Sequence, residues 1–143
     1  MAKYIIAYDL GTGGCKASLY EESGQCLQSS FAGYDTYFPK VGWYEQKPEE
    51  WWKGFSESTK GLLASTLTNK KDLVSLALSG HSMGVVPIDR TGRLLRDHTP
   101  IWSDTRARRQ VEEFFSKIDP EDWYLTTGNG FSRECYAVFK ILW

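Results

Sequence analysis

The sequence predicts an α/β fold, in which helices and a sheet pack as layers. Three observations support this class: short β-prone segments near the N-terminus, a helical pattern that begins at Pro48, and the nearly continuous apolar segment 73–80. The predicted order is three strands, a helix, a fourth strand, a hairpin and a second helix.

The first three strands are expected at residues 4–9, 16–20 and 25–31. The first, "YIIAYD", is mostly apolar with little alternation, which predicts burial on both faces. Segment 73–80, "LVSLALSG", has the same character. Because short turns such as "EESG" separate the first three strands, an antiparallel meander is expected.

Pro48 suits the first position of a helix, and Glu49 and Glu50 suit its first turn, where carboxylates complement the helix dipole. The predicted buried stripe of this helix consists of Trp52, Phe55, Thr59, Leu62, Leu63 and Leu67.

A second amphipathic helix is expected from Ser103, after a hairpin near 85–95. Its apolar face comprises Ala107, Val111, Phe114, Phe115 and Ile118. Arg108–Glu112 and Arg109–Glu113 are the expected i,i+4 pairs, and Asp119 is expected to cap a further short helix. The final stretch, "ECYAVFKILW", has a helix-like stripe without a stop signal, which indicates the N-terminal part of a longer protein.

Composition narrows the function classes. The 143 residues carry a formal net charge of -1, which gives no reason to expect nucleic acid or an anionic membrane as a partner. The chain has no apolar run long enough to span a membrane and no signal-peptide pattern. Cys15, Cys26 and Cys135 are scattered and form no CxxC pair, which favours the reducing cytoplasm over a disulfide framework or a zinc site.

The segment "IIAYDLGTGGCKASLY", residues 5–20, contains three glycines within four positions. Glycine is costly to order, so this density suggests close approach of a ligand to the backbone. Walker A spacing is absent, and Lys16 occupies the place of the third glycine in the dinucleotide motif, where a strand follows instead of a helix.

A tight hairpin turn at 11–14 can instead present successive backbone N–H groups as a nest for phosphate oxygens. Thr12 adds a hydroxyl group and Lys16 a positive charge. Asp9 would repel phosphate unless a hard cation such as Mg²⁺, held through water, lies between them. The alternative is an ordinary type I′ hairpin with an aspartate cap.

The segment "YDLGTGGCKASLYEESG" is similar to the first phosphate-binding hairpin of the sugar kinase, Hsp70 and actin superfamily. More narrowly, the chain resembles the FGGY carbohydrate kinases, the family of xylulokinase, gluconokinase and glycerol kinase. Four further segments contribute in the family's order: "VGWYEQKPEEWW", "LSGHSMGVVPIDRTGRLLR", "PIWSDTRA", and "TTGNGFS" followed by "KILW".

The resemblance implies a ribonuclease-H-like fold with a mixed sheet and helices. Residues 1–143 would be the opening portion of the first, sugar-binding domain, with the second, ATP-binding domain outside this sequence. The implied activity is transfer of the ATP γ-phosphoryl group to a hydroxyl of a pentulose such as xylulose, or of a related carbohydrate. A small-molecule sugar is then the expected partner, and a homodimer of the full-length protein is compatible with the family.

The resemblance also assigns residues. Mg²⁺ would lie near Asp9, the catalytic residue expected within this stretch, and the terminal phosphates of ATP would contact Thr12, Gly13, Gly14 and Lys16. The family's catalytic base is an aspartate beyond residue 143, so these 143 residues alone are not expected to phosphorylate a sugar.

On the sugar side, the resemblance points to His81, Ser82 and Met83, which occupy the stretch that reads Gln-Met-His in xylulokinase-like members. Glycerol kinases typically have Arg-Glu in this region, and its absence argues against glycerol. Trp102 would form an apolar wall for the sugar and Asp104 would accept a hydroxyl hydrogen bond. His81 could instead be a loop histidine, and Asp104 could instead be the N-cap of the following helix.

Two other functions stay open at this point. One is a non-catalytic or vestigial ligand-binding protein. The other is an actin- or Hsp70-like ATPase, which would share the glycine hairpin but not "GHSMG" or "WSDTRA".

Overall fold

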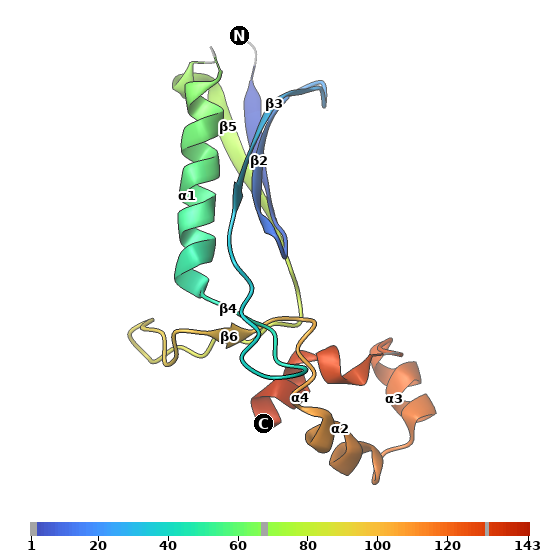
Figure 1. The fold of residues 1–143 in the computed structure, drawn as a ribbon. Helices are drawn as coiled ribbons and strands as arrows, with labels where there is room; N and C mark the ends of the chain where they lie inside the picture. Colours follow the sequence, from blue (N-terminus) through green and yellow to red (C-terminus); the bar gives the residue numbers. More distant parts are fainter. Residues whose placement is uncertain (1–2, 67–68, 131) are drawn as a thin grey trace. The chain divides into compact units, whose positions relative to one another are not determined.

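The computed structural model describes residues 3–66, 69–130 and 132–143 (Figure 1). Contacts divide the chain into two compact units. The first unit comprises residues up to 35 together with 48–81, and the second comprises 36–47 together with 82–143.

The first unit is built on a four-stranded sheet in the order β3-β2-β1-β5. Strands β1 (Tyr4–Leu10), β2 (Gly14–Glu21) and β3 (Cys26–Gly33) form the predicted antiparallel meander. After the short 3₁₀ turn Lys70–Asp72, β5 (Leu73–Gly80) pairs parallel with β1, which makes the sheet mixed.

Helix α1 (Pro48–Ala64) begins at the predicted proline and packs mainly on β2 and β3 (Figure 1). Between helix and sheet lies a core of Ile6, Tyr8, Cys15, Ala17, Leu19 and Leu62. Buried residues alternate along β1, so the expectation of burial on both of its faces is wrong.

The buried face of α1 agrees in part with the predicted stripe, because Leu62 is buried and Phe55 and Leu63 pack against the core. Trp52 is 69% exposed, whereas Gly54 and Ser58 are buried, and Leu67 lies outside the described residues. A Cβ atom at Gly54 would lie 3.0 Å from the ring of Tyr34, so a residue without a side chain lets the helix approach closely. Small residues therefore contribute to this contact beside the large apolar ones.

Strand β5 is exposed along most of its length, although five of its eight residues are apolar. Val74, Leu76 and Leu78 are 56%, 64% and 67% exposed. Helix α1 packs mainly on β2 and β3, whereas β5 lies at the opposite edge of the sheet, beyond β1.

In the second unit, β4 (Glu45–Gln46) pairs with β6 (Thr99–Pro100), and a bridge between Ile88 and Leu94 closes the predicted hairpin. Its other elements are α2 (Arg108–Phe115), α3 (Pro120–Thr127), a 3₁₀ turn (Arg133–Cys135) and α4 (Ala137–Leu142).

The packing of α2 confirms most of its predicted apolar face. Ala107 and Val111 are buried with Phe139 of α4, and Phe114 and Phe115 pack against them. Ile118, the last predicted member of this face, is 40% exposed. The helix starts five residues later than predicted, at Arg108 rather than Ser103.

Local polar contacts around α2 and α3 agree in part with the sequence. Asp119 caps α3, accepting hydrogen bonds from two backbone N–H groups. Arg109 pairs with Glu113 at 2.7 Å as expected, whereas Arg108 pairs with Glu134 at 3.8 Å rather than with Glu112.

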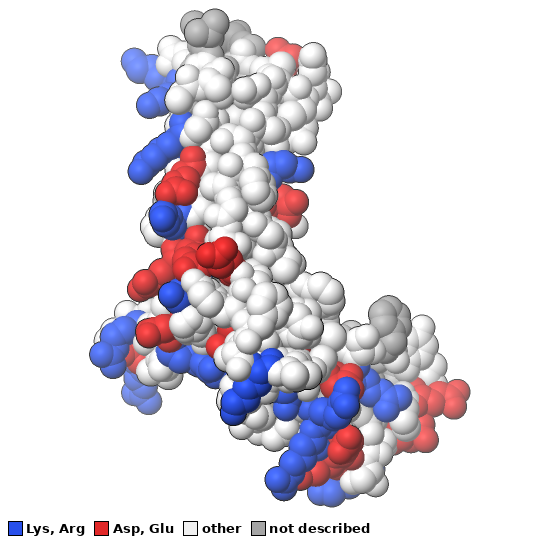
Figure 2. All heavy atoms as spheres, in the orientation of Figure 1, with Lys and Arg blue, Asp and Glu red and all other residues white. Residues whose placement is uncertain are grey.

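Basic and acidic side chains are interspersed on the face shown in Figure 2. Along α1, for example, Lys53 and Glu57 form an exposed pair at 3.8 Å. No helix within the described residues is long and apolar enough to cross a membrane.

Candidate functional site

The glycine turn connects β1 to β2 in the first unit. Gly11 N donates to Gly14 O at 3.0 Å, which closes the turn. A Cβ atom on Gly13 would meet nothing within 4 Å, so this glycine has open space beside it. At Gly14, by contrast, a Cβ atom would lie 2.4 Å from the ring of Phe31, so a glycine is required there for the close approach of β3.

Asp9 and Lys16 stand directly opposite each other in the β1–β2 ladder, and both are exposed. On the other side of β1, Asp9 is aligned with Ser79 of β5. Paired positions project on the same face of a sheet, so one acid and one base lie together beside the turn.

Asp9 fits a water-mediated magnesium contact. The described residues contain no cluster of three or more His, Cys, Asp or Glu side chains that could hold a metal ion. An exposed single carboxylate suits Mg²⁺, which keeps several waters and usually takes one or two protein carboxylates together with substrate phosphates.

Tyr34, which directly follows β3, forms hydrogen bonds to the glycine turn. This contact was not predicted from the sequence. Its hydroxyl donates to the carbonyl of Gly11, and its backbone N–H donates to the carbonyl of Gly13 at 3.4 Å. Burial, with smaller effects from the charges of Cys15 and Asp9, raises the pKa of Tyr34 to about 12. The hydroxyl is therefore neutral and able to donate at physiological pH.

On the sequence-based expectation that this turn binds the phosphates of ATP, replacing Tyr34 by Phe in the full-length protein should raise the KM for ATP about threefold to tenfold, because one hydrogen bond that shapes the turn is lost. The KM for the second substrate and the activity of the exposed control Tyr124→Phe should not change. An unchanged ATP constant in Tyr34→Phe would contradict this role.

The burial of Tyr34 also gives it a pH signature. Because its pKa is raised to about 12 from an ordinary value near 10, its contribution to stability is complete below about pH 10 and is lost as the pH rises through about 12. Between about pH 10 and 12, the melting temperature of Tyr34→Phe should therefore fall less steeply with pH than that of the wild-type protein.

His81 lies at the end of β5, where its backbone N–H donates to Leu10 O at 3.0 Å. Its imidazole packs edge-on against Trp51, with 4.9 Å between ring centroids. Both ring nitrogens are buried without a hydrogen bond among the described residues, and burial lowers the pKa of His81, which favours the neutral ring.

The second unit contains a hollow of about 450 Å³, which we call the Trp102 pocket. It brings together three of the predicted sugar contacts, Ser82, Met83 and Trp102. The sequence did not predict the other lining residues, which are Asn129, Ser132, Cys135 and Tyr136. His81 and Asp104 do not line this pocket.

Backbone strain is concentrated in the Trp102 pocket. Met83 has φ 63° and Ser132 has φ 49°, and among the described residues these are the only two non-glycine residues with positive φ. Such conformations cost free energy and cluster at binding sites. They therefore support the pocket as a functional site.

The chemistry of the Trp102 pocket suits a small polyhydroxylated ligand. Ser82, Ser132 and Tyr136 offer hydroxyl groups, Asn129 offers an amide, and Trp102 offers an indole face. Convergent hydrogen-bonding groups beside an aromatic wall are what such ligands need. The sequence segment that could have indicated the unpredicted lining residues Asn129 and Ser132 is "TTGNGFS", to which no binding role was assigned from the sequence.

Asp104 is fully buried and engaged within the protein. Its carboxylate accepts from Tyr44 N at 2.7 Å and from Nε and Nη2 of Arg106 at 2.8 and 2.7 Å. The N-cap of α2 is Ala107, so the alternative prediction of Asp104 as that cap is wrong. These contacts favour a structural role, although the predicted sugar contact stays a prediction.

Arg106 is the centre of this buried network. Its Nη2 also lies 2.7 Å from the Glu45 carboxylate, and its guanidinium lies over the rings of Trp43 and Trp143, at 4.0 and 5.0 Å from their centroids. Burial alone would lower the pKa of Arg106, but the hydrogen bonds and charges of Asp104 and Glu45 outweigh burial and raise it. The side chain is therefore a buried, paired cation.

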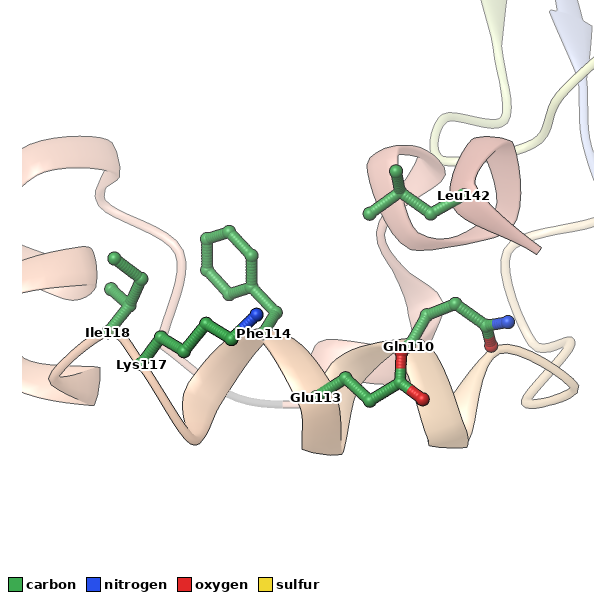
Figure 3. A pocket seen from close by; sticks show the side chains of 6 residues that line it. All are labelled: Gln110, Glu113, Phe114, Lys117, Ile118 and Leu142. Carbon is green, nitrogen blue, oxygen red and sulfur yellow. The ribbon is translucent and has the colours of Figure 1, made fainter.

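Another hollow, of about 410 Å³, lies beside α2 and α4 (Figure 3). None of the predicted site residues lines it. Its lining residues are Gln110, Glu113, Phe114, Lys117, Ile118 and Leu142.

Comparisons with known proteins cover almost the entire chain. Residues 4–143 match the N-terminal domain of the FGGY family of carbohydrate kinases. The chain is 31% identical over 140 residues to a xylulose kinase of Staphylococcus xylosus, covering 98% of this chain and 28% of that protein. It is 28% identical over 128 residues to a glycerol kinase of Beutenbergia cavernae, covering 90% of this chain and 25% of that protein.

The chain is also similar to solved structures of carbohydrate kinases. A "xyloylose kinase" from Brucella ovis superimposes with a TM-score of 0.88 at 28% identity, covering 98% of this chain and 28% of that one. Plasmodium falciparum glycerol kinase with ADP gives 0.82 at 27% identity, covering 99% and 28%. These likenesses confirm the predicted fold class, and the chain spans little more than a quarter of the length of these relatives.

Proposed function

Because this chain belongs to the FGGY family of carbohydrate kinases, we propose that the whole protein transfers the γ-phosphoryl group of ATP to a hydroxyl group of a small sugar. The proposed substrate is a pentulose of the xylulose type. Xylulose kinases are among the similar proteins, and the Arg-Glu pair that is typical of glycerol kinases in the region of His81 is absent from this sequence.

The observation that carries this proposal is the Trp102 pocket. It gathers three hydroxyl groups, an amide and an indole from separate segments, with two strained residues in its wall. In the proposed function these groups bind and orient the sugar, so that one hydroxyl is presented for reaction. Positioning is the main contribution that a protein makes to phosphoryl transfer.

The glycine turn has the complementary role in this proposal. Backbone N–H groups at Gly13 and Gly14, with Thr12 and Lys16, hold the terminal phosphates of ATP, and Asp9 holds Mg²⁺ through water. When bound, Mg²⁺ neutralises charge that develops on the phosphoryl oxygens. The general base and the adenosine site are assigned to the part of the protein beyond residue 143, and the cytoplasm is the proposed location.

The test is an assay of ADP formation by the full-length protein with Mg²⁺–ATP and a panel of D-xylulose, D-ribulose, glycerol and D-gluconate. We expect the highest kcat/KM with a pentulose. A preference for glycerol or gluconate would overturn the substrate class. Sugar binding without ADP formation would favour the non-catalytic alternative.

Residues 1–143 alone are expected to form no ADP with any of these sugars, because the proposed base and adenosine site are missing. Measured beside the full-length protein, sugar-dependent turnover by the segment that disappears in Asp9→Ala would contradict this prediction.

A further inference from the structure

Lys140 of α4 is a buried cation. It is 5% exposed, and its Nζ lies 3.3 Å from the carbonyl oxygen of Met83 and 3.5 Å from those of Trp102 and Glu134. It also donates to the carbonyl of Cys135. Among the described residues, no carboxylate lies within ion-pair distance of this ammonium.

Three of these four carbonyls belong to residues that line the Trp102 pocket: Met83, Trp102 and Cys135. They come from the loop after β5, the loop after β6 and the 3₁₀ turn before α4. An ammonium carries three N–H donors and no acceptor, so it can bind several carbonyls that converge from different segments. One side chain therefore joins three walls of the pocket.

We propose that Lys140 is a positioning residue for the sugar pocket, in which its buried ammonium fixes the main chain at Met83, Trp102 and Cys135. The strained backbone of Met83, with φ 63°, is one of the conformations that this contact holds. The proposal rests on the proposed function for the identity of the ligand, whereas the geometry stands on the contacts themselves.

The energetics separate this role from ordinary stabilisation. A buried ammonium without a carboxylate partner is costly to desolvate, and burial lowers the pKa of Lys140 accordingly. Replacement by Met removes this desolvation cost, which offsets the loss of the hydrogen bonds to the four carbonyls. Lys140→Met should therefore impair the pocket without lowering the melting temperature of the protein.

The experiment compares full-length Lys140→Met with Lys117→Met, the same change at an exposed lysine that does not line the pocket. With D-xylulose as the probe, the KM for the sugar is expected to rise about tenfold or more in Lys140→Met, with the KM for ATP within about twofold. Both constants should be unchanged in the control. A normal sugar KM, or a parallel loss of all constants together with the melting temperature, overturns the proposal.

A second readout needs no sugar. In a Cys26→Ser background, residues 1–143 keep two cysteines, Cys135 in the pocket wall and Cys15 in the core of the first unit, and peptide mass spectrometry follows the labelling of each. Lys140→Met should speed the reaction of Cys135 with a small thiol reagent about tenfold, while Cys15 and the control variant keep their rates. Equal Cys135 rates with and without Lys140 would overturn the positioning role.

These readouts distinguish the two proposals. If the wild-type protein phosphorylates none of the sugars, the proposed function fails, while the thiol measurement still decides the role of Lys140. If Lys140→Met does not fold, Lys140→Gln, which keeps two N–H donors, replaces it. The Gln variant is expected to show intermediate effects, and wild-type constants and labelling rates in that variant would overturn the proposal.

Discussion

If the proposed function is correct, Asp9→Asn in the full-length protein is expected to lower kcat about 10²–10³-fold while the KM for the sugar changes less than about threefold. The amide keeps the shape of the carboxylate but loses its charge, which in the proposed function holds Mg²⁺ beside the transferring phosphoryl group. The Mg²⁺ concentration that gives half-maximal activity should rise in the same variant.

Asp72→Asn is a matched control for Asp9. Asp72 directly precedes β5, and it lies at the opposite end of the same sheet, where Leu73 is aligned with Tyr4. Its loss should leave kcat and both KM values unchanged. If Asp9→Asn kept a near-normal kcat and lost only sugar affinity, Asp9 would belong to the sugar site instead.

Asp104→Ala is expected to lower the free energy of unfolding by about 3–5 kcal/mol, the usual cost of removing one partner from a buried ion pair. The change leaves the buried guanidinium of Arg106 with only Glu45, and it also leaves the backbone N–H of Tyr44 without its acceptor. Chemical denaturation of the full-length protein, followed by tryptophan fluorescence, measures the loss.

Two comparisons sharpen the Asp104 result. Glu113→Ala removes the exposed pair with Arg109 and should cost less than about 1 kcal/mol. Asp104→Ala combined with Arg106→Met should recover part of the loss, because it removes the uncompensated charge. If Asp104→Ala instead kept normal stability and weakened sugar binding at least tenfold, the sugar contact predicted from the sequence would be correct.

The elements that the sequence predicted are those with local signals. The strands of the meander, the start of α1 at Pro48 and the cap at Asp119 each depend on residues a few positions apart. Propensity, turn chemistry and capping act over this range, so they can be read directly from the chain.

The features that the sequence did not predict depend largely on contacts between residues far apart in the chain. Besides its ion pair with Arg106, Asp104 accepts a hydrogen bond from Tyr44, 60 residues away, and the role of Tyr34 depends on Gly11, 23 residues away. The apolar pattern of β5 correctly predicted a strand, but burial depends on where α1 lies, which periodicity does not specify. Likewise, Ser132 joins the pocket through a left-handed backbone conformation that no sequence pattern announced.

The uncovered strand β5 also has a consequence for handling the protein. Among the described residues, it pairs with β1 along one side only, and its exposed side chains Val74, Leu76 and Leu78 are apolar. An unpaired strand edge with exposed apolar side chains can form hydrogen bonds with further strands, including those of other copies of the same molecule. Residues 1–143 produced in isolation should accordingly self-associate as their concentration rises, so light scattering belongs beside every activity assay of this segment.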